Sequence, residues 1–341
     1  MKVAALHVDG VVLDVDSVSP FHVLREDGTV VPRGAGLTPA DGLADADLAA
    51  LPALWSAYTG GRRDEAVARL DEAQAAGKQV VVWVDGDQEV DLDHPAALLF
   101  EQGPTRGRPR THAWPVLIHD HLDKRYDNRV DPVARGERPT VGFCGQSTAQ
   151  LAGRARLLAG KARLRVEHRL GRTDRLAAPW ASHLRLRTRA LDRLADDPRI
   201  ATDFIVRDRY RAGLRDVAER MDRAHPTAAD FFGNIRRNAY TLCVRGGGNF
   251  STRFYETLCL GRIPVLVDSG AALPWEGVVP WEELVVVVPE AALDELADRV
   301  VAHHAARDEE AFAEAQAACR RVWSDRLSVP GFFGHVVELL S

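Results

Sequence analysis

The sequence predicts an α/β protein built from two doubly wound domains, and three observations support this prediction. The chain has 341 residues, which is long for a single core and suits two domains of ordinary size. Apolar runs of strand length alternate with helix-periodic stretches in both halves. A charged stretch containing Gly and Pro, residues 123–139, interrupts the alternation and is the expected linker. We therefore expect domains over residues 1–135 and 136–341, with ligands bound in the crevice at the carboxyl ends of the strands.

The first domain opens with a strand and continues in α/β alternation. Continuous apolar runs such as VVVWV are typical of strands that are covered on both faces of a parallel sheet. A stretch with helical periodicity lies between the first two of these runs. We expect strands at 3–9, 78–87 and 114–121 and a helix over 61–78.

The second domain repeats the alternation and ends in helices. The two tail stretches, 289–306 and 308–327, carry apolar residues three and four apart, so each is expected to bury one face. An Arg-rich, helix-periodic region follows the first strand, and a further helix is expected near 211–223. The expected strands are 140–145, 203–207, 240–246, 262–268 and 283–290.

Composition excludes several classes of protein. The formal net charge of −5 gives the whole molecule no field that would attract nucleic acid, so partners must be inferred from local features. No apolar run approaches the roughly 20 residues of a membrane-spanning helix. The N-terminal run alternates like a strand and does not resemble a signal peptide, so we expect a cytoplasmic protein.

The four cysteines occur singly, without metal-ligand spacing, and are expected to be reduced core residues: Cys144, Cys243, Cys259 and Cys319.

The stretch RGGGNFSTRFYETLCLGRIPVLVD, residues 245–268, is the strongest candidate for a binding site. Its order predicts a strand, a glycine turn and a short helix that ends near Gly261. Gly246, Gly247 and Gly248 lack the Cβ atoms that would hold a ligand away from the backbone. Helix N-termini favour anions, and either residue of the pair Asn249 and Ser251 can cap this one. A diphosphate is the expected ligand.

Charged side chains accompany the turn. Arg245, at the expected strand end, offers a planar fork for phosphate oxygens. Arg253 and Glu256 are three residues apart and share one helix face, where Arg253 could contact phosphate and Glu256 the ribose hydroxyls. In the alternative interpretation those two residues pair with each other on the surface and the glycines form a tight turn without a ligand. Neither a GxGxxG motif nor a P-loop lysine is present.

The pattern RGxGNxSxRxYExLxxGRIPV resembles the C-terminal half of exostosin-like glycosyltransferases of the glycosyltransferase 47 type. The resemblance runs from about residue 203 to 289 and includes the pair Leu273 and Pro274 and the later Trp281 in the expected order. The strand at 138–145 is also similar, whereas the first 130 residues match only in a general way. The resemblance implies the GT-B architecture, in which two Rossmann-like domains face a central cleft. The C-terminal domain would then bind the donor and the N-terminal domain the acceptor.

The resemblance also implies an activity. In an inverting transfer, an acceptor hydroxyl attacks the anomeric carbon of a nucleotide sugar, here expected to be UDP-linked, and the nucleoside diphosphate leaves. The acceptor would be a saccharide or another small hydroxylated molecule, and neither a cofactor nor a metal is required. Carried over by position, the donor site comprises Arg245, Gly246, Gly247, Gly248, Asn249, Ser251, Arg253 and Glu256, with Arg207 as a second phosphate contact. Two alternatives remain: a GDP-fucose-type fucosyltransferase, and a non-catalytic nucleotide- or sugar-binding module.

An inverting enzyme needs a base on the acceptor side to accept the hydroxyl proton. Asp85 and Asp87 follow a predicted strand, where this architecture places ligands, although they could equally be turn residues. We interpret their DxD spacing as coincidental. In the expected strand at 114–121, His119 and His121 share a face while Asp120 points the other way, so Asp120 and His119 are further candidate bases.

Two other features have alternative explanations. The Arg-rich run from Arg154 to Arg193 could bind an anionic acceptor such as a lipid-linked diphosphate, which leaves peripheral membrane contact open, or could be the solvated face of helices. Trp275 and Trp281 could stack on a base or a sugar, or could pack in the core. The sequence carries no prediction of the oligomeric state.

Overall fold

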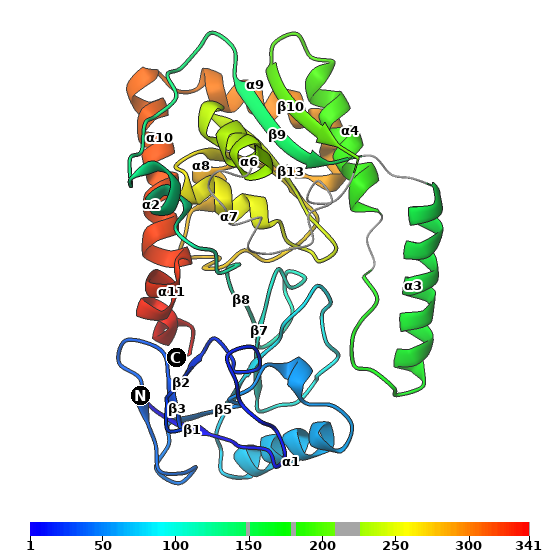
Figure 1. Ribbon diagram of the computed structural model, residues 1–341, viewed down its shortest axis with the longest axis vertical. Coiled ribbons are helices and arrows are strands. Elements are labelled where there is room, and N and C mark those ends of the chain that lie inside the picture. The colour runs from blue at the N-terminus through cyan, green and yellow to red at the C-terminus, as the bar shows by residue number, and fades with distance from the viewer. Residues whose placement is uncertain (148–150, 179–181, 209–225, 341) are drawn as a thin grey trace.

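The computed structural model describes residues 1–147, 151–178, 182–208 and 226–340 and contains two parallel sheets, one in each half of the chain. Figure 1 shows the two sheets in separate units, with the N-terminal unit below the C-terminal one. The α/β class and the two facing units agree with the predicted GT-B arrangement, so the fold-class prediction is confirmed.

The first sheet has six parallel strands in the order β4-β1-β5-β6-β7-β8. The central strands β6 and β7 are buried along their whole length, as the continuous apolar runs predicted. Helix α1 (Gly61–Ala75) contributes Leu70 to the core on one face. A separate hairpin is formed by β2 (His22–Leu24) and β3 (Val30–Pro32). The sheet strands are β1 (Lys2–Ala5), β4 (Thr38–Pro39), β5 (Leu48–Ala50), β6 (Val80–Trp83), β7 (Ala97–Glu101) and β8 (Thr111–Ala113).

The strand predicted at 114–121 is wrong. Strand β8 ends at Ala113, and helix α2 (His121–Tyr126) begins where the strand was expected to end. The physical reason is a helix cap, because the Asp120 carboxylate accepts hydrogen bonds from the backbone N–H groups of Leu122 and Asp123. The inference that His119 and His121 share a strand face fails with it.

The second sheet has five parallel strands in the order β10-β9-β11-β12-β13. All five lie at or near the predicted positions. The expected helix near 211–223 lies outside the described residues. The strands are β9 (Thr140–Gln146), β10 (Ala201–Arg207), β11 (Tyr240–Val244), β12 (Ile263–Asp268) and β13 (Val286–Pro289).

Helices surround the second sheet and the predicted tail helices are present. Helix α7 ends at Cys259, and Gly261 just beyond it takes the left-handed conformation at φ +62°, as the predicted C-terminal cap requires. The helices are α3 (Leu151–Arg169), α4 (His183–Ala195), α6 (Pro226–Arg237), α7 (Thr252–Cys259), α8 (Trp281–Leu284), η3 (Glu290–Glu295), α9 (Leu296–Ala305), α10 (Glu309–Val322), η4 (Trp323–Leu327), α11 (Val329–His335) and η5 (Val336–Leu339).

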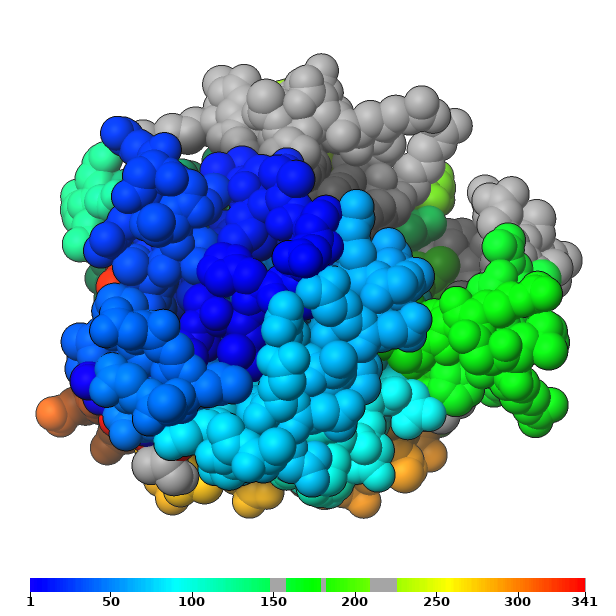
Figure 2. Space-filling view, turned by 90° about the horizontal axis from the view of Figure 1, so that it is seen from below, coloured from blue at the N-terminus to red at the C-terminus, as the bar shows by residue number. Residues whose placement is uncertain are grey.

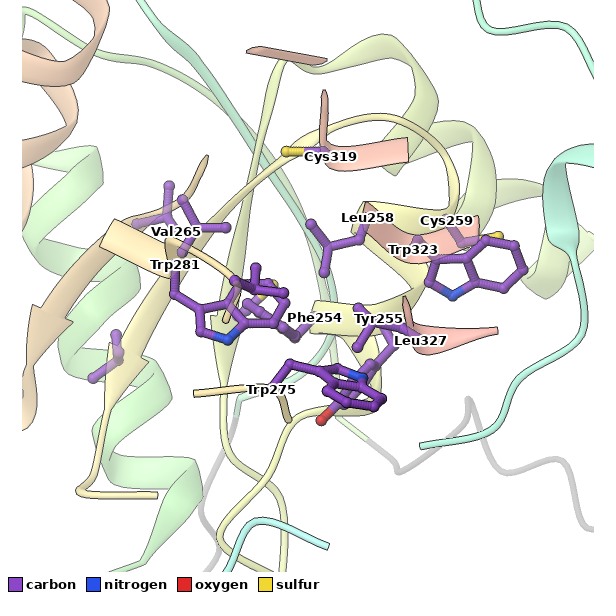
Figure 3. Packing of buried hydrophobic residues seen from close by; sticks show 14 of the residues in the cluster. Phe254, Tyr255, Leu258, Cys259, Val265, Trp275, Trp281, Cys319, Trp323 and Leu327 are labelled. Carbon is purple, nitrogen blue, oxygen red and sulfur yellow. The ribbon is translucent and has the colours of Figure 1, made fainter. Parts of the chain in front are cut away.

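The core beneath α7 is aromatic and explains the two tryptophans near the motif. Figure 3 shows Phe254 and Trp281 side by side, and their ring centroids are 5.4 Å apart. The indole N–H of Trp275 donates to the Arg326 carbonyl at 2.8 Å, and that of Trp281 donates to the Pro274 carbonyl at 2.9 Å. Both tryptophans are buried, so in this structure they pack in the core. The four cysteines are also buried and free, as predicted.

The chain crosses between the two units more than once. Helix α11 returns from the C-terminal unit toward the first sheet (Figure 1). There Phe332 and Phe333 pack against Trp83, with ring centroids 6.2 and 6.0 Å away. In the other direction, α2 packs on the second unit, since the His121 ring lies 4.3 Å from that of Phe232. The boundary predicted at residue 135 therefore remains a prediction.

Candidate functional site

Two adjoining pockets lie at the carboxyl ends of strands from both sheets, where the fold predicts a ligand. They share Gly103 from the first unit and Asn249 from the second. We call them the Arg245 pocket and the Asp87 pocket. The Arg245 pocket is lined by Gly103, Arg245, Asn249, Phe250, Ser251, Phe254, Tyr255, residues 266–269 and residues 271–273. The Asp87 pocket is lined by Val84, Gly86, Asp87, Gln88, Glu89, Glu101, Gln102, Gly103 and Asn249.

Arg245 is the basic side chain of the Arg245 pocket. It follows β11 directly and is only 2% exposed, and its Nη2 lies 3.6 Å from Oε2 of Glu290. Burial lowers the pKa of the guanidinium, while Glu290 opposes that effect, and an arginine remains charged in either case. A buried cation at a strand end can stabilise negative charge that develops on a ligand.

Other basic groups gather around the end of β11. Arg187 on α4 donates from Nη2 to the Arg245 carbonyl at 3.1 Å and from Nη1 to the Gln146 carbonyl at 2.8 Å. Burial, together with the nearby charges of Arg187 and Arg245, lowers the pKa of His183 to about 4. His183 is therefore neutral at pH 7, and the positive charge around it comes from Arg187, Arg245 and Lys161.

The surroundings of the three glycines differ. None of Gly246, Gly247 and Gly248 has a left-handed φ, so a strained tight turn does not explain them. A Cβ on Gly247 would lie 2.6 Å from Oδ2 of Asp87, and one on Gly248 would lie 2.6 Å from Cε1 of Phe250 and 3.0 Å from the Asp87 carbonyl oxygen. A Cβ on Gly246 would meet only the Phe250 carbonyl, at 3.9 Å. The bare backbone of Gly247 thus admits Asp87 from the first unit, and that of Gly248 admits both the Phe250 ring and the Asp87 carbonyl. Beside Gly246 there is open space.

Asn249 and Ser251 lie at the start of α7, as predicted. Ser251 occupies the N-cap position, but its side chain makes no capping hydrogen bond. Asn249 is 4% exposed, and its Oδ1 accepts a hydrogen bond from Ser269 Oγ at 2.6 Å. Among the described residues its buried Nδ2 has no hydrogen-bond partner. An unsatisfied buried amide between two pockets is a candidate ligand contact.

Arg253, Glu256 and Arg207 lie outside the linings of both pockets. The guanidinium of Arg253 lies 4.3 Å from the ring centroid of Phe143, and its Nη2 donates to the Cys144 carbonyl at 2.6 Å. Arg253 is therefore held against β9, where the charge of Glu256 still acts on it, and its role as a phosphate ligand remains a prediction. Glu256 is half-buried.

Arg207 ends β10 and is held by α6. Its Nη2 lies 3.1 Å from Oδ2 of Asp230 and 3.4 Å from the Thr227 carbonyl. A phosphate contact from this side chain would first require the ion pair with Asp230 to break, and it remains a prediction.

The four candidate catalytic bases lie in different surroundings. Asp87 contacts the glycine turn and lines its own pocket, whereas the Oδ1 atom of Asp85 accepts from the Ser56 backbone N–H at 3.1 Å. Asp120 caps α2 and pairs with Nη2 of Arg320 at 2.6 Å. Burial acts to raise the pKa of Asp120, but the hydrogen bond from Arg320 and the capping N–H groups hold it below its usual range. His119 is exposed and lines neither pocket.

Glu101 and Glu89 are site residues that the sequence interpretation missed. Glu101 ends β7, is 2% exposed, and pairs with Nη1 of Arg108. Burial raises the pKa of Glu101 to about 7, although Arg108 and the Val90 N–H act in the opposite direction. Glu89 Oε1 accepts from the backbone N–H and the hydroxyl of Thr105, both at 2.6 Å. The sequence contains a pattern that could have indicated Glu101, because this carboxylate follows the apolar run ALLF much as Asp85 follows VVVWV.

The loop that carries Asp87 is held from the second unit. The Leu176 N–H donates to the Glu89 carbonyl at 2.8 Å, and the Asp91 N–H donates to the Asp174 carbonyl at 2.6 Å. The Asp174 carboxylate accepts from Trp55 Nε1 at 2.5 Å and pairs with Arg63. The position of Asp87 therefore depends on a segment that lies about 90 residues further along the chain.

Neither a metal-binding cluster nor a membrane-spanning helix occurs in the part of the chain that the structure describes. Within it, no group of three or more His, Cys, Asp or Glu side chains is placed to hold a metal ion. Likewise, no helix in the described ranges is long and apolar enough to cross a membrane.

Comparison with known proteins confirms the resemblance. Residues 189–302, which include β10, β11, α7 and β12, match the exostosin GT47 domain. A probable beta-1,4-xylosyltransferase, IRX10 of Arabidopsis thaliana, is 35% identical over 72 residues, covering 21% of this chain and 17% of that protein. A probable glucuronosyltransferase, GUT1 of Oryza sativa subsp. japonica, is 33% identical over 66 residues, covering 19% and 15% respectively. The matched segment thus spans about a sixth of each relative's length.

Solved structures are similar only at a low level. TarM aligns with a TM-score of 0.34 and 9% identity, covering 77% of this chain and 50% of that one. A glycosyltransferase from Rickettsia africae ESF-5 aligns with a TM-score of 0.32 and 9% identity, covering 80% and 79%. Such low scores do not establish a shared fold. The architecture of this chain is shown by its own two parallel sheets.

Proposed function

We propose that this protein is a glycosyltransferase that moves a sugar from a nucleotide sugar to a hydroxylated acceptor. The observation that carries the proposal is Arg245, a buried cation at the carboxyl end of β11, in a pocket between the two units and inside the segment that matches the exostosin GT47 domain. A saccharide or another small hydroxylated molecule is the proposed acceptor, and a UDP-linked sugar is the proposed donor.

The donor half of the proposal follows from charge. When the bond between the anomeric carbon and the diphosphate oxygen breaks, its electron pair remains on the diphosphate. Arg245 is placed to stabilise that charge, and a fixed cation in a site with little water can contribute several kcal/mol to such a step. The start of α7 adds the positive end of the helix dipole, and the Ser251 side chain forms no capping hydrogen bond that would compete with a ligand there. Of the three glycines, Gly246 leaves space beside its Cα for a phosphate oxygen, although its own N–H donates to the Phe250 carbonyl at 2.9 Å.

On the acceptor side, Asp87 is the proposed catalytic base. The acceptor oxygen forms the new bond to the anomeric carbon from the side opposite the leaving diphosphate and transfers its proton to the Asp87 carboxylate, which inverts the anomeric centre. Asp87 is the one candidate base that touches the glycine turn. Its carboxylate lies against Gly247, and like charges repel, so we infer that the loop at 84–89 shifts when the diphosphate binds.

The decisive experiment is a donor screen with one substitution and one matched control. UDP-, GDP- and other nucleotide sugars are incubated with the protein, and both donor hydrolysis and transfer to an acceptor panel are measured. Arg245→Ala should reduce turnover of the active donor about 100- to 1,000-fold, by analogy with removal of one oxyanion donor. Arg193→Ala, on the exposed side of α4 in an ion pair with Asp294, should leave turnover within about twofold.

The same screen separates the alternatives. A nucleotide at a hundred times its dissociation constant raises the free energy of unfolding by about 2.7 kcal/mol. Thermal shift with UDP and with GDP therefore identifies the nucleobase of the donor. A larger shift with GDP would favour the fucosyltransferase-type alternative. Nucleotide binding without hydrolysis or transfer by the wild-type protein would favour a binding module. Turnover that Arg245→Ala leaves unchanged would contradict the proposed donor site.

A further inference from the structure

The outer face of helix α3 is unusually apolar for a surface helix. Leu158, Val166 and Leu170 are 67%, 55% and 59% exposed. They are spaced eight and four residues apart, so they lie along one side of the helix. Ala162, between them in the same series, is also exposed. Isolated exposed apolar residues are normal on a soluble protein, but a row of them on one helix marks an interaction surface.

Arginines flank this apolar row. Arg163, Arg165 and Arg169 are all exposed. Residues 151–175 contain eight Lys and Arg but only two Asp and Glu, whereas the whole chain has 44 basic and 49 acidic residues. Glu167 lies 2.8 Å from Arg163 and neutralises only that arginine. The region is thus a strongly basic patch on an otherwise acidic protein.

The opposite face of α3 is held against the rest of the molecule, which keeps the apolar row turned outward. His168 lies 3.0 Å from Oδ2 of Asp91 in the first unit, and the chain after the helix forms a bridge between Arg175 and Val90. Lys161 and Leu164, on the held side, are less exposed than the neighbours that face outward. Figure 1 shows α3 standing at the flank of both units, and in Figure 2 the green segment projects from the side of the molecule.

We propose that the outer face of α3 docks onto an anionic lipid surface. Its chemistry is that of an interfacial helix, in which aliphatic side chains insert among the acyl chains while arginines pair with lipid phosphates. Charge complementarity determines this choice of occupant, because the patch is basic and a membrane surface rich in acidic lipid is the extended negative surface that also accepts Leu158, Val166 and Leu170. This inference does not depend on the proposed transferase activity.

Vesicle binding tests the proposal. The full-length protein is co-sedimented with vesicles of phosphatidylcholine alone and with vesicles that contain phosphatidylglycerol in addition. We expect binding at least tenfold tighter to the anionic vesicles, and the difference should shrink as salt increases. A triple variant, Leu158→Ser with Val166→Ser and Leu170→Ser, should lose that binding. The control, Val12→Ser with Val15→Ser, changes side chains that are 80% and 86% exposed elsewhere and should bind within about twofold of the wild type.

Charge is tested separately from apolar contact. Arg165→Gln with Arg169→Gln should weaken binding to anionic vesicles at least fivefold and reduce its salt dependence. Arg193→Gln with Arg199→Gln, on exposed side chains outside the patch, should have little effect. Thermal unfolding of each variant establishes that it folds. Equal wild-type binding to both kinds of vesicle, or undiminished binding by the triple variant, would overturn the proposal. So would a wild-type dimer that the triple variant converts to a monomer, which would assign the face to a second copy of the chain.

Discussion

The Arg245 pocket and the Asp87 pocket adjoin, but they are built in different ways. Most of the Arg245 pocket comes from one stretch, residues 245–273, in which strand, turn, helix and strand follow in order. The Asp87 pocket combines the loop after β6, the end of β7 and Asn249 from the other unit, and residues 174–176 hold its main loop in place. A site made from one contiguous segment leaves a recognisable pattern in the sequence, whereas a site assembled from distant segments does not.

The largest expected effect comes from Asp87, which connects the two pockets. Asp87→Asn keeps the shape of the side chain but removes the proposed base, so transfer should fall about 100- to 10,000-fold. The affinity of the protein for the nucleoside diphosphate should stay the same or rise, because a negative charge beside the glycine turn is lost. Initial rates and nucleotide titrations measure the two effects.

Asp93→Asn is the matched control for that substitution. The side chain of Asp93 is 88% exposed and pairs with Arg110, so both transfer and affinity should stay near the wild-type values. If Asp87→Asn lowered nucleotide affinity and transfer in equal proportion, Asp87 would belong to the donor site and the two pockets would not divide the reaction as proposed.

The second prediction concerns Gly103, where the two pockets meet. Gly103 has φ +58°, and a Cβ there would lie 2.6 Å from the Asn249 carbonyl oxygen, which is backbone and cannot easily move. Gly103→Ala should therefore cost about 3 kcal/mol of unfolding free energy, from backbone strain and the clash together. Gly107→Ala is the control: Gly107 has φ +83° with no atom within 4 Å, so it isolates the strain and should cost about 1 kcal/mol. Denaturant unfolding measures both variants, and equal costs would mean that the two units do not meet closely at Gly103.

The third prediction is a pH dependence that belongs to the Asp87 pocket. Burial raises the pKa of Glu101 from 4.5 to about 7, so between these values the folded protein holds a proton that the unfolded chain has released. This contribution to stability is complete below about pH 4.5 and is lost as the pH rises through about 7. The stability of the wild type relative to Glu101→Gln should therefore fall by about 3 kcal/mol across that window. Thermal unfolding of both proteins from pH 4.5 to 7.5 measures it. A difference that does not change with pH would mean that Arg108 keeps Glu101 ionised throughout.

The smallest expected effect distinguishes glycines within the turn. Gly247→Ala places a methyl group against Oδ2 of Asp87, the mobile end of a side chain, so it should cost only about 1 kcal/mol. Gly246→Ala meets nothing closer than 3.9 Å and should leave stability unchanged, although it should weaken nucleotide binding if a phosphate lies there. In a double-mutant cycle, Asp87→Ala should remove most of the cost of Gly247→Ala. Additive costs would mean that the two residues do not touch in solution.

The α/β fold was predictable from the sequence, and so were the strand, turn and helix that carry most of the Arg245 pocket, whereas their ligand remains a proposal. The strands of the second sheet were readable because their apolar runs are continuous and their turns carry Gly and Pro. Arg245, Asn249 and Ser251 were predicted in the right places because each follows a strand or starts a helix within one short segment. Asp120 was assigned to a strand because its local pattern alternates, and only its capping hydrogen bonds show that it starts a helix.

The sequence by itself determined the α/β class, the helix cap at Gly261 and the position of Arg245 at a strand end, because these depend on local periodicity and backbone preference. The tertiary structure alone decided which carboxylate reaches the glycine turn, that Arg253 lies on Phe143, and that Gly247 makes room for Asp87. The physical reason is that such contacts join segments more than 100 residues apart. Their occurrence depends on how two sheets pack, and local propensity does not encode that packing.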